Sequence, residues 1–233
     1  MPRLITVIPT LNAASSLHAT LECIAQAERS GLGSALLVSD AGSSDGTAAI
    51  AKRAGAIVFS SPRGRGVQLA SGAQAAARFA QSDDWFLFLH ADTRPQLGWT
   101  GVVSTFIEKH ADSPRAAYFR FALDDISHRA RRLERAVCWR CRTFGLPYGD
   151  QGLLIRRDHY EALGGYKPWP LFEDVDLVRK IGRRNLDELP IRAITSAERF
   201  QRDGYVVRSA RNLSLLVRYY LGESPHRLAR LYR

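Results

Sequence analysis

The first 120 residues alternate short apolar runs with longer segments that suit helices. The apolar runs are bounded by Gly, Asp and Ser, and they predict four strands: Leu4–Ile8, Ala35–Ser39, Ala56–Ser60 and Trp85–Leu89. The segments between them are rich in Ala and Leu and contain no Pro, and they predict three helices: Ser15–Arg29, Gly46–Ala54 and Val67–Ala80. Strands that alternate with helices are typical of βαβ units. We therefore expect an α/β fold whose mostly parallel sheet is flanked by helices.

The pattern changes after the fourth strand. Pro95 suits the first turn of a helix, which we expect to run to about Lys109. The pattern beyond it predicts a strand over Ala116–Ala122, a helix over Ile126–Arg142, a short strand over Gly149–Ile155, a short helix over Asp158–Leu163 and a helix over Phe172–Arg183. No repeat or low-complexity linker interrupts the chain. We expect one domain over residues 1–204 and a basic, helical C-terminal extension over residues 205–233.

Composition and charge narrow the class of protein. With 233 residues, 45% of them hydrophobic, the chain can bury one substantial core. Its 33 Lys and Arg residues exceed its 23 Asp and Glu residues, which makes the net charge +10. Only four of the basic residues are Lys, and guanidinium groups bind phosphates and anionic headgroups well. The single copy of Arg63-Gly64-Arg65-Gly66 between a strand and a helix is no RNA-binding repeat, so we expect no nucleic acid partner.

Several features bear on where the protein works. Three cysteines cannot form a disulfide framework, and the N-terminus lacks a signal-peptide pattern, so we expect a reducing cytoplasm. No run approaches the roughly 18 uncharged apolar residues of a spanning helix. The C-terminal extension is rich in Arg, Leu and Tyr, with Glu223 as its one acid. Two interpretations stay open: this extension packs on the core, or it contacts the anionic inner face of a membrane peripherally.

Polar residues follow each of the four predicted strands. The segments are Pro9-Thr10-Leu11-Asn12, Asp40 to Thr47, Pro62 to Gly66, and His90-Ala91-Asp92. Each segment by itself also fits an ordinary turn or helix cap. Because the carboxyl ends of parallel strands meet at one edge of a sheet, four such segments favour a ligand site at that edge.

The chain resembles the family 2 glycosyltransferases of the GT-A fold over about residues 3–185. The likeness rests on Ile8 to Asn12, Asp40 with Gly42 to Thr47, His90-Ala91-Asp92 and Phe172 to Leu177. More narrowly, Arg63 to Gln68, Leu89 to Thr93 and Gly149 to Gly152 are similar to the bacterial radical-SAM/selenodomain-associated transferases, a label that names no substrate. The resemblance implies a GT-A-like sheet and an inverting enzyme that moves a sugar from a UDP- or GDP-linked donor to an unidentified acceptor hydroxyl, with lipid-linked acceptors among the candidates.

The resemblance implies a nucleotide-sugar site along the sheet edge, comprising Pro9, Thr10, Asn12, Asp40, Arg63, Arg65, His90 and Ala91. Pro9 and Thr10 would border the nucleobase, and Asp40 would accept a hydrogen bond from a uracil-like or guanine-like edge. Arg63 and Arg65 would reach the base or the diphosphate, because a guanidinium fork suits phosphate oxygens.

The resemblance also implies a divalent metal. Asp92 occupies the last place of the family's Asp-x-Asp motif, where a carboxylate would hold Mg²⁺ or Mn²⁺ against the donor diphosphate. The first Asp of that motif is His90 in this chain, which lowers the negative charge of the site, although imidazole is an acceptable Mn²⁺ ligand. The alternative from the residues alone is a buried histidine at a strand end, followed by a helix cap.

Two acids and three further residues complete the expected site. The resemblance makes Asp174 the base that deprotonates the acceptor, with Glu173 second, although acids in a helix's first turn need no such role. Asp150, Gln151 and Trp169 would lie on the acceptor side, or else form a tight turn and pack a loop.

Two other functions remain open from the sequence. A sugar-phosphate nucleotidyltransferase would share the fold, but its Gly-rich phosphate loop should follow the first strand, and residues 9–12 contain no Gly. A non-enzymatic basic adaptor that binds nucleic acid or membrane would leave the carboxylates purely structural.

Overall fold

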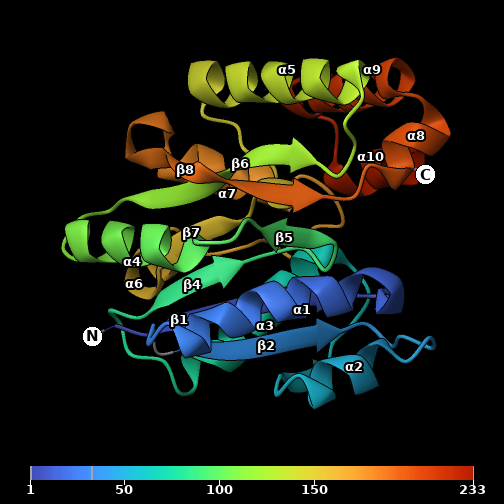
Figure 1. Cartoon of the computed structure of the whole chain (residues 1–233). Coiled ribbons are helices and arrows are strands. Elements are labelled where there is room, and N and C mark those ends of the chain that lie inside the picture. Colours follow the sequence, from blue (N-terminus) through green and yellow to red (C-terminus); the bar gives the residue numbers. More distant parts are fainter. Residues whose placement is uncertain (1, 33, 233) are drawn as a thin grey trace.

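A computed structural model describes residues 2–32 and 34–232. Within them, eight strands form one sheet in the order β3-β2-β1-β4-β7-β6-β8-β5 (Figure 1). The strands are β1 (Leu4–Thr10), β2 (Ser34–Asp40), β3 (Ile57–Ser60), β4 (Trp85–Phe88), β5 (Thr93–Pro95), β6 (Ala116–Leu123), β7 (Leu153–Arg156) and β8 (Leu186–Thr195). The pairings from β3 through β4 and between β6 and β8 are parallel, whereas β7 and β5 pair antiparallel. The expected α/β architecture with a mostly parallel sheet is confirmed.

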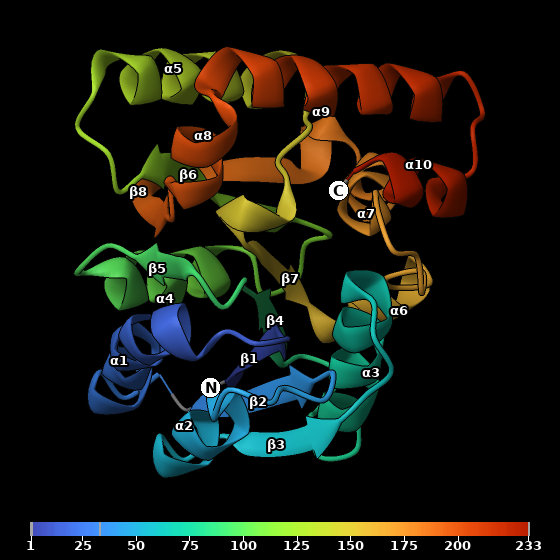
Figure 2. The same ribbon diagram turned by 90° about the vertical axis from the view of Figure 1, so that its right-hand side faces the viewer.

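Helices cover both faces of the sheet (Figures 1 and 2). In chain order they are α1 (Ala14–Arg29), α2 (Thr47–Arg53), α3 (Arg65–Ala77), α4 (Trp99–Lys109), α5 (His128–Phe144), α6 (Arg157–Ala162), α7 (Glu173–Ile181), α8 (Glu198–Asp203), α9 (Tyr205–Tyr220) and α10 (Pro225–Leu231), with 3₁₀ turns η1 (Gly149–Gln151) and η2 (Arg183–Asn185). Helices α1 and α4 pack in one hydrophobic cluster, and α3, α6 and α7 pack in the other.

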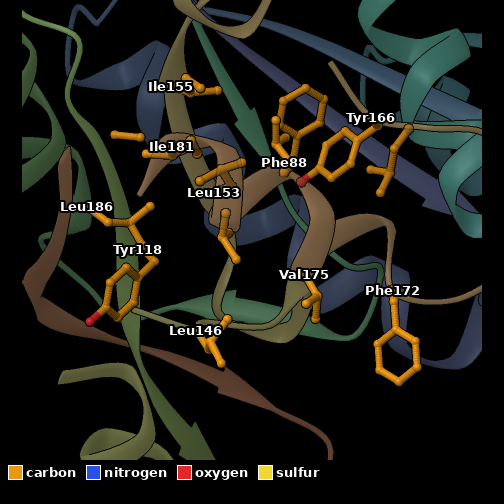
Figure 3. Close-up of a cluster of buried hydrophobic side chains, with 14 of the residues drawn as sticks. Phe88, Tyr118, Leu146, Leu153, Ile155, Tyr166, Phe172, Val175, Ile181 and Leu186 are labelled. Carbon is orange, nitrogen blue, oxygen red and sulfur yellow. The ribbon is translucent and has the colours of Figure 1, made fainter. Parts of the chain in front are cut away.

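The central strands are buried on both faces, which explains why they are continuous apolar runs in the sequence. In β1, Leu4 and Ile8 belong to the cluster under α1 and α4, whereas Ile5 and Val7 belong to the cluster under α3. Figure 3 shows part of the second cluster, in which Phe88 and Tyr166 lie edge to face with ring centroids 4.8 Å apart. Val175 of α7 is fully buried in the same cluster, so the first turn of α7 is held close to the end of β4.

The predicted helix start at Pro95 is wrong. Residues Thr93–Pro95 form β5, which pairs with β8, and α4 begins at Trp99. Proline lacks an N–H group and is tolerated in an edge strand, and β5 is the last strand of the sheet. The local proline signal was therefore overridden by pairing with a strand 100 residues away.

Two further boundaries differ from the prediction. The strand expected over Gly149–Ile155 begins only at Leu153, because Gly149–Gln151 forms a 3₁₀ turn and Gly152 has a φ of 64°. Strand β8 was not predicted, since Pro190 interrupts its pattern. The pairing of β6 with β8 shifts register between Phe119 and Arg120, and Pro190 falls in the resulting bulge.

The C-terminal residues pack on the domain as two helices. Leu215 and Leu216 of α9 and Leu228 of α10 are buried in the same hydrophobic cluster as the sheet. Both views show α9 beside α5 in a layer at one end of the molecule, above β6 and β8 (Figures 1 and 2). Among the described residues, no helix is both long and apolar enough to span a membrane.

Candidate active site

Two cavities meet beyond the carboxyl ends of β1 and β4. We call them the edge cavity, which is bordered by the β1–α1 loop, and the inner cavity, which is bordered by η1 and helices α7 to α10. They share five lining residues: Arg65, His90, Asp92, Ser196 and Arg199. A ligand in one cavity would therefore contact a ligand in the other at these residues.

The edge cavity contains most residues expected along the sheet edge. Its lining includes Pro9, Thr10, Asn12, Arg65, His90, Ala91 and Asp92. Gln68 of α3 joins them, since its Nε2 donates to the Thr10 carbonyl at 2.7 Å and to the Ser39 carbonyl at 2.9 Å. This buried amide ties the end of β1 to β2, so it holds the floor of the cavity in place.

Asp40 lies beside the edge cavity rather than in its wall. Its carboxylate accepts hydrogen bonds from Thr10 Oγ1 at 2.8 Å, from Ser43 Oγ and N, and from Gly42 N. Burial would raise the pKa of Asp40, but these hydrogen bonds outweigh it and hold the pKa below its usual value. The four hydrogen bonds occupy the acceptor positions of both oxygens, so Asp40 shapes the loop that follows β2.

Asn12 helps to fix the conformation of the loops after β1 and β2. It has a φ of 50°, and its side-chain oxygen accepts from Ser44 N at 2.9 Å, while its own N–H donates to Ser43 Oγ. The neighbouring Asp45 accepts from Ala14 N at the start of α1. The two loops after β1 and β2 thus form one hydrogen-bonded unit at the mouth of the cavity.

His90 lies at the junction of the two cavities. Its Nε2 atom is buried and finds no hydrogen-bond partner among the described residues. Burial lowers the pKa of His90 to about 3. The charge of Arg65 also lowers this pKa, whereas the charge of Asp174 raises it. His90 is therefore a neutral imidazole at physiological pH. A Cβ atom at Gly149 would lie only 2.6 Å from Nε2, so the backbone of η1 reaches His90 only because residue 149 is glycine.

Glu173 and Asp174 are adjacent in sequence but have different surroundings. Glu173 is fully buried, forms a salt bridge with Arg65 and lines neither cavity. Asp174 lines the inner cavity, where its Oδ2 accepts from Gly149 N at 2.9 Å and lies 3.7 Å from an Arg65 nitrogen. Of the two acids, Asp174 alone is in a position to touch a ligand.

Asp150 also faces the inner cavity. Its Oδ1 atom is buried and has no hydrogen-bond partner within residues 2–32 and 34–232. Burial raises the pKa of Asp150 to about 6, with Arg140 opposing the shift and Asp174 and Asp92 adding to it. A carboxyl group with this pKa and a free oxygen can accept or hold a proton close to neutral pH.

The structure does not bring the remaining expected residues into the cavities. Gln151 is buried and bonded to Arg140, Cys141 and the Phe119 carbonyl. Trp169 is half-buried and packs against Tyr219 of α9, with ring centroids 6.4 Å apart. Arg63 is exposed in the loop before α3 and lines neither cavity.

A model of one protein family matches the chain over residues 6–162, which is more than half of its length. That family is described as glycosyl transferase family 2. The chain belongs to this family. It is thus a glycosyltransferase, and the expected enzyme class is confirmed. A search of curated proteins finds no match to this chain.

Solved structures of other glycosyltransferases share the fold of this family 2 chain. The mannosyltransferase PcManGT from Pyrobaculum calidifontis, in complex with GDP-Man and Mn²⁺, aligns with a TM-score of 0.61 and 17% identity over 90% of this chain and 60% of that one. TarS residues 1–349 from S. aureus align with a TM-score of 0.61 and 13% identity over 92% and 64%. Glucosyl-3-phosphoglycerate synthase from Mycobacterium tuberculosis, with Mn²⁺, UDP and glucosyl-3-phosphoglycerate, aligns with a TM-score of 0.53 and 18% identity over 84% and 70%. The expected GT-A fold is confirmed.

Sequence reasoning missed the far wall of both cavities in this family 2 domain. Ser196 and Arg199 follow β8 and line both, while Arg208 and Asn212 of α9 and Tyr232, directly after α10, line the inner cavity. Polar residues after a strand are the signal that would have found Ser196 and Arg199, had β8 been recognised. The sequence predicted a helical C-terminal extension, but no local pattern places α9 and α10 in a cavity wall, because that depends on how they pack.

Asp92 suits a metal ion whose remaining ligands come from a bound substrate and water. No group of three or more His, Cys, Asp and Glu side chains in the described ranges is arranged to hold a metal. The Asp92 carboxylate is partly exposed in both cavities, and no described cation lies within ion-pair distance of it. Mg²⁺ and Mn²⁺ commonly bind through one or two carboxylates with substrate phosphates and water. The residues present fit such a site, with the buried Nε2 of His90 next to it.

Proposed function

We propose that the chain is an inverting glycosyltransferase that moves a sugar from a UDP- or GDP-linked donor to an acceptor hydroxyl. The observation that carries the proposal is the junction of the two cavities at Arg65, His90 and Asp92, with Asp174 in the inner one. The edge cavity would hold the nucleotide, and the inner cavity the acceptor. The anomeric carbon would then lie between Asp92 and Asp174.

Asp92 would hold Mg²⁺ or Mn²⁺ against the donor diphosphate, and the bound ion would offset the charge of the departing nucleoside diphosphate. His90 is neutral and presents an unpartnered Nε2, so it adds a hydrogen-bonding group there without adding charge. The solved structures support a metal of this kind, since PcManGT was crystallised with GDP-Man and Mn²⁺ and the phosphoglycerate enzyme with UDP and Mn²⁺.

Asp174 would accept the proton of the attacking hydroxyl. It lines the inner cavity, and hydrogen bonds from Gly149 N and Val175 N keep its carboxylate in one orientation. An oriented base lets the acceptor attack on the face opposite the leaving group, which inverts the anomeric centre. Arg65 contacts both Glu173 and Asp174, so it would couple the base to the donor side.

A nucleotide-binding experiment tests this assignment. We expect UDP or GDP with Mn²⁺ to raise the melting temperature, because a ligand at 100 times its Kd stabilises by about 2.7 kcal/mol. Asp92→Ala should lose the metal-dependent part of the shift. Asp112→Ala is the matched control, since Asp112 is exposed and lines neither cavity. No shift with either nucleotide, together with an unchanged activity of Asp92→Ala, would contradict the proposal.

The released product separates the alternatives. A glycosyltransferase releases a nucleoside diphosphate, whereas a nucleotidyltransferase that makes the donor releases pyrophosphate. Production of pyrophosphate from a sugar phosphate and a nucleoside triphosphate would favour the second function. An adaptor without enzymatic activity would release neither.

The placement in the radical-SAM/selenodomain-associated subgroup is also a proposal, and it rests on the motifs Arg63 to Gln68 and Gly149 to Gly152.

A peripheral membrane contact is a second proposal, supported by the outer layer of the molecule. The outward side of α9 is apolar, with Val206, Leu213, Val217 and Leu221 exposed. The neighbouring α5 exposes Trp139 and the basic residues Arg132 and Arg135. Apolar side chains flanked by guanidinium groups suit the surface of an anionic membrane.

A further inference from the structure

The inner cavity continues into a basic recess formed by α8, α9 and α10. We call this recess the arginine cavity; it is lined by Arg199, Arg202, Asp203, Arg208, Arg211 and Tyr232. Arg199, Arg208 and Tyr232 line the inner cavity as well, so the two spaces are continuous. Four of the six lining residues carry guanidinium groups, and one carries a carboxylate.

The single carboxylate is shared between two of these arginines. Asp203 lies 2.8 Å from Arg202 Nε and 2.6 Å from Arg208 Nη1. Arg199 has no carboxylate partner among the described residues, although it lines all three cavities. Arg199 therefore brings a positive charge that the two ion pairs of Asp203 do not offset.

Arg208 is held in place by Asp203, and its second terminal nitrogen is only weakly hydrogen-bonded. Its side chain is only 10% exposed, and its guanidinium lies 5.5 Å from the centre of the Phe200 ring. Its Nη2 lies 3.5 Å from Tyr232 Oη, which is longer than a normal hydrogen bond. A nearly buried guanidinium with a weakly bonded N–H is well placed to donate to an anion.

The rest of the inner cavity offers groups that suit a hydroxylated ligand. The Oδ1 atoms of Asn212 and Asp150 are buried and lack a donor within the described ranges. Asp174 lies in the same cavity. The cavity thus presents hydrogen-bond acceptors around Asp174 and guanidinium donors toward α8 and α9.

We infer that the acceptor of this enzyme carries a phosphate group, which binds in the arginine cavity while a hydroxyl of the same molecule lies at Asp174. This inference rests on the proposed function and names its substrate class. Guanidinium forks match the oxygens of phosphate better than they match neutral sugars. The phosphate belongs either to a soluble molecule or to a lipid headgroup, and both present the same chemistry to the arginines.

Binding of sn-glycerol 3-phosphate, with glycerol as the neutral counterpart, tests the inference by calorimetry. Saturating UDP or GDP with Mg²⁺ keeps the probe out of the edge cavity. We expect glycerol 3-phosphate to bind and glycerol not to bind. The double variant Arg202→Gln/Arg211→Gln should weaken glycerol 3-phosphate about tenfold, the size of one lost charge-assisted hydrogen bond. Both residues are exposed and lie outside the edge cavity, so the Kd for the nucleotide should not change.

Arg132→Gln/Arg135→Gln on the outer side of α5 removes the same two charges away from the cavities and should leave all Kd values unchanged. Arg199→Gln provides a second variant inside the recess, and it should weaken glycerol 3-phosphate as well. Equal binding of the two probes, or unchanged binding of glycerol 3-phosphate in both recess variants, would overturn the inference while the nucleotide still binds. Loss of nucleotide binding in the unmodified protein would instead overturn the proposed function.

Vesicles distinguish the two sources of phosphate. Vesicles of phosphatidylglycerol, whose headgroup carries a phosphate and free hydroxyls, would assign the phosphate to a lipid headgroup if they bind the unmodified protein but not Arg202→Gln/Arg211→Gln. Vesicle binding that the double variant leaves intact, together with weakened glycerol 3-phosphate, would assign it to a soluble acceptor. Both outcomes support a phosphate-bearing acceptor.

Discussion

Arg65 at the start of α3 and Glu173 at the start of α7 form a salt bridge across 108 positions of the chain. Glu173 is fully buried, whereas Arg65 is 30% exposed and faces both cavities. Burial raises the pKa of Glu173, and the charge of Arg65 opposes that shift. The pair joins the first half of the sheet, where the nucleotide would bind, to the helix that carries Asp174.

Glu173→Gln is expected to destabilise the fold. It leaves Arg65 without its full charge partner, and removing one member of a buried ion pair typically costs about 3–5 kcal/mol. Because Arg65 is partly exposed to water, we expect the lower end of that range or less. Urea denaturation measures the loss, and Glu161→Gln in the exposed pair with Arg157 is the control, with an expected change below about 1 kcal/mol.

Asp174→Asn is expected to lower kcat by about 10² to 10⁴, the usual contribution of a general base. The amide has one acceptor oxygen, so it keeps the hydrogen bond from Gly149 N and loses that from Val175 N. We therefore expect a stability loss of about 0.5–1.5 kcal/mol and little change in the KM for the donor. Release of nucleoside diphosphate from the donor sugar, with water as the acceptor, measures the effect. A kcat close to that of the unmodified enzyme would remove Asp174 from the role of base.

Gly66→Ala is expected to destabilise the protein by about 1–3 kcal/mol through overpacking. A Cβ atom there would lie 2.4 Å from the Trp169 carbonyl oxygen and 2.5 Å from the Lys167 carbonyl oxygen, and backbone atoms cannot turn away. Gly101 of α4 is the matched control, since a Cβ there meets nothing within 4 Å. Gly101→Ala should stabilise by about 0.5–1 kcal/mol in urea titrations. Equal effects at the two glycines would contradict the close packing of the loop with Lys167 and Trp169 against Gly66 of α3.

Asp150→Asn is expected to change the pH dependence of stability. Burial raises the pKa of Asp150 to about 6, above the roughly 3.9 of an unfolded Asp. The folded state thus binds this proton more tightly, and the associated stability is complete below about pH 4 and lost as the pH rises through about 6.

An amide cannot ionise, so Asp150→Asn should be more stable than the unmodified protein at pH 8, by on the order of 3 kcal/mol. The difference should vanish near pH 4. Thermal unfolding at the two pH values, with nucleotide and metal omitted, measures it. A difference that does not depend on pH would show that Asp150 titrates normally.

Leu213→Glu/Val217→Glu is expected to abolish binding to phosphatidylglycerol vesicles. Leu213 is 60% exposed on the outer side of α9, and acidic residues there would repel anionic headgroups. Sedimentation with vesicles measures binding, and phosphatidylcholine vesicles control for charge. If the outer side of α9 instead contacts a second copy of the chain, the unmodified protein should form dimers at high concentration and ignore vesicles.

Much of the first half of the fold could be predicted because its signals are local. Strands such as Leu4–Thr10 and Trp85–Phe88 are buried on both faces and read as apolar runs, and polar residues follow them. Pro95 misled the prediction, because an edge strand tolerates proline as well as a helix start does. Pro190 is likewise unfavourable for a strand in the sequence pattern, but in β8 it lies in a β-bulge, where no ladder hydrogen bond from its nitrogen is needed.

The sequence by itself determined the α/β fold and the edge of the sheet where Thr10, His90 and Asp92 meet, because the strands of the first half and their polar ends follow from short-range patterns. Only the tertiary structure decided which of two neighbouring acids faces a cavity, since Glu173 is fully buried against Arg65 whereas Asp174 lines the inner cavity. It also decided that the C-terminal helices wall the inner cavity. The pair of Arg65 and Glu173 joins residues 108 positions apart, and such long-range packing leaves no periodic trace in the chain.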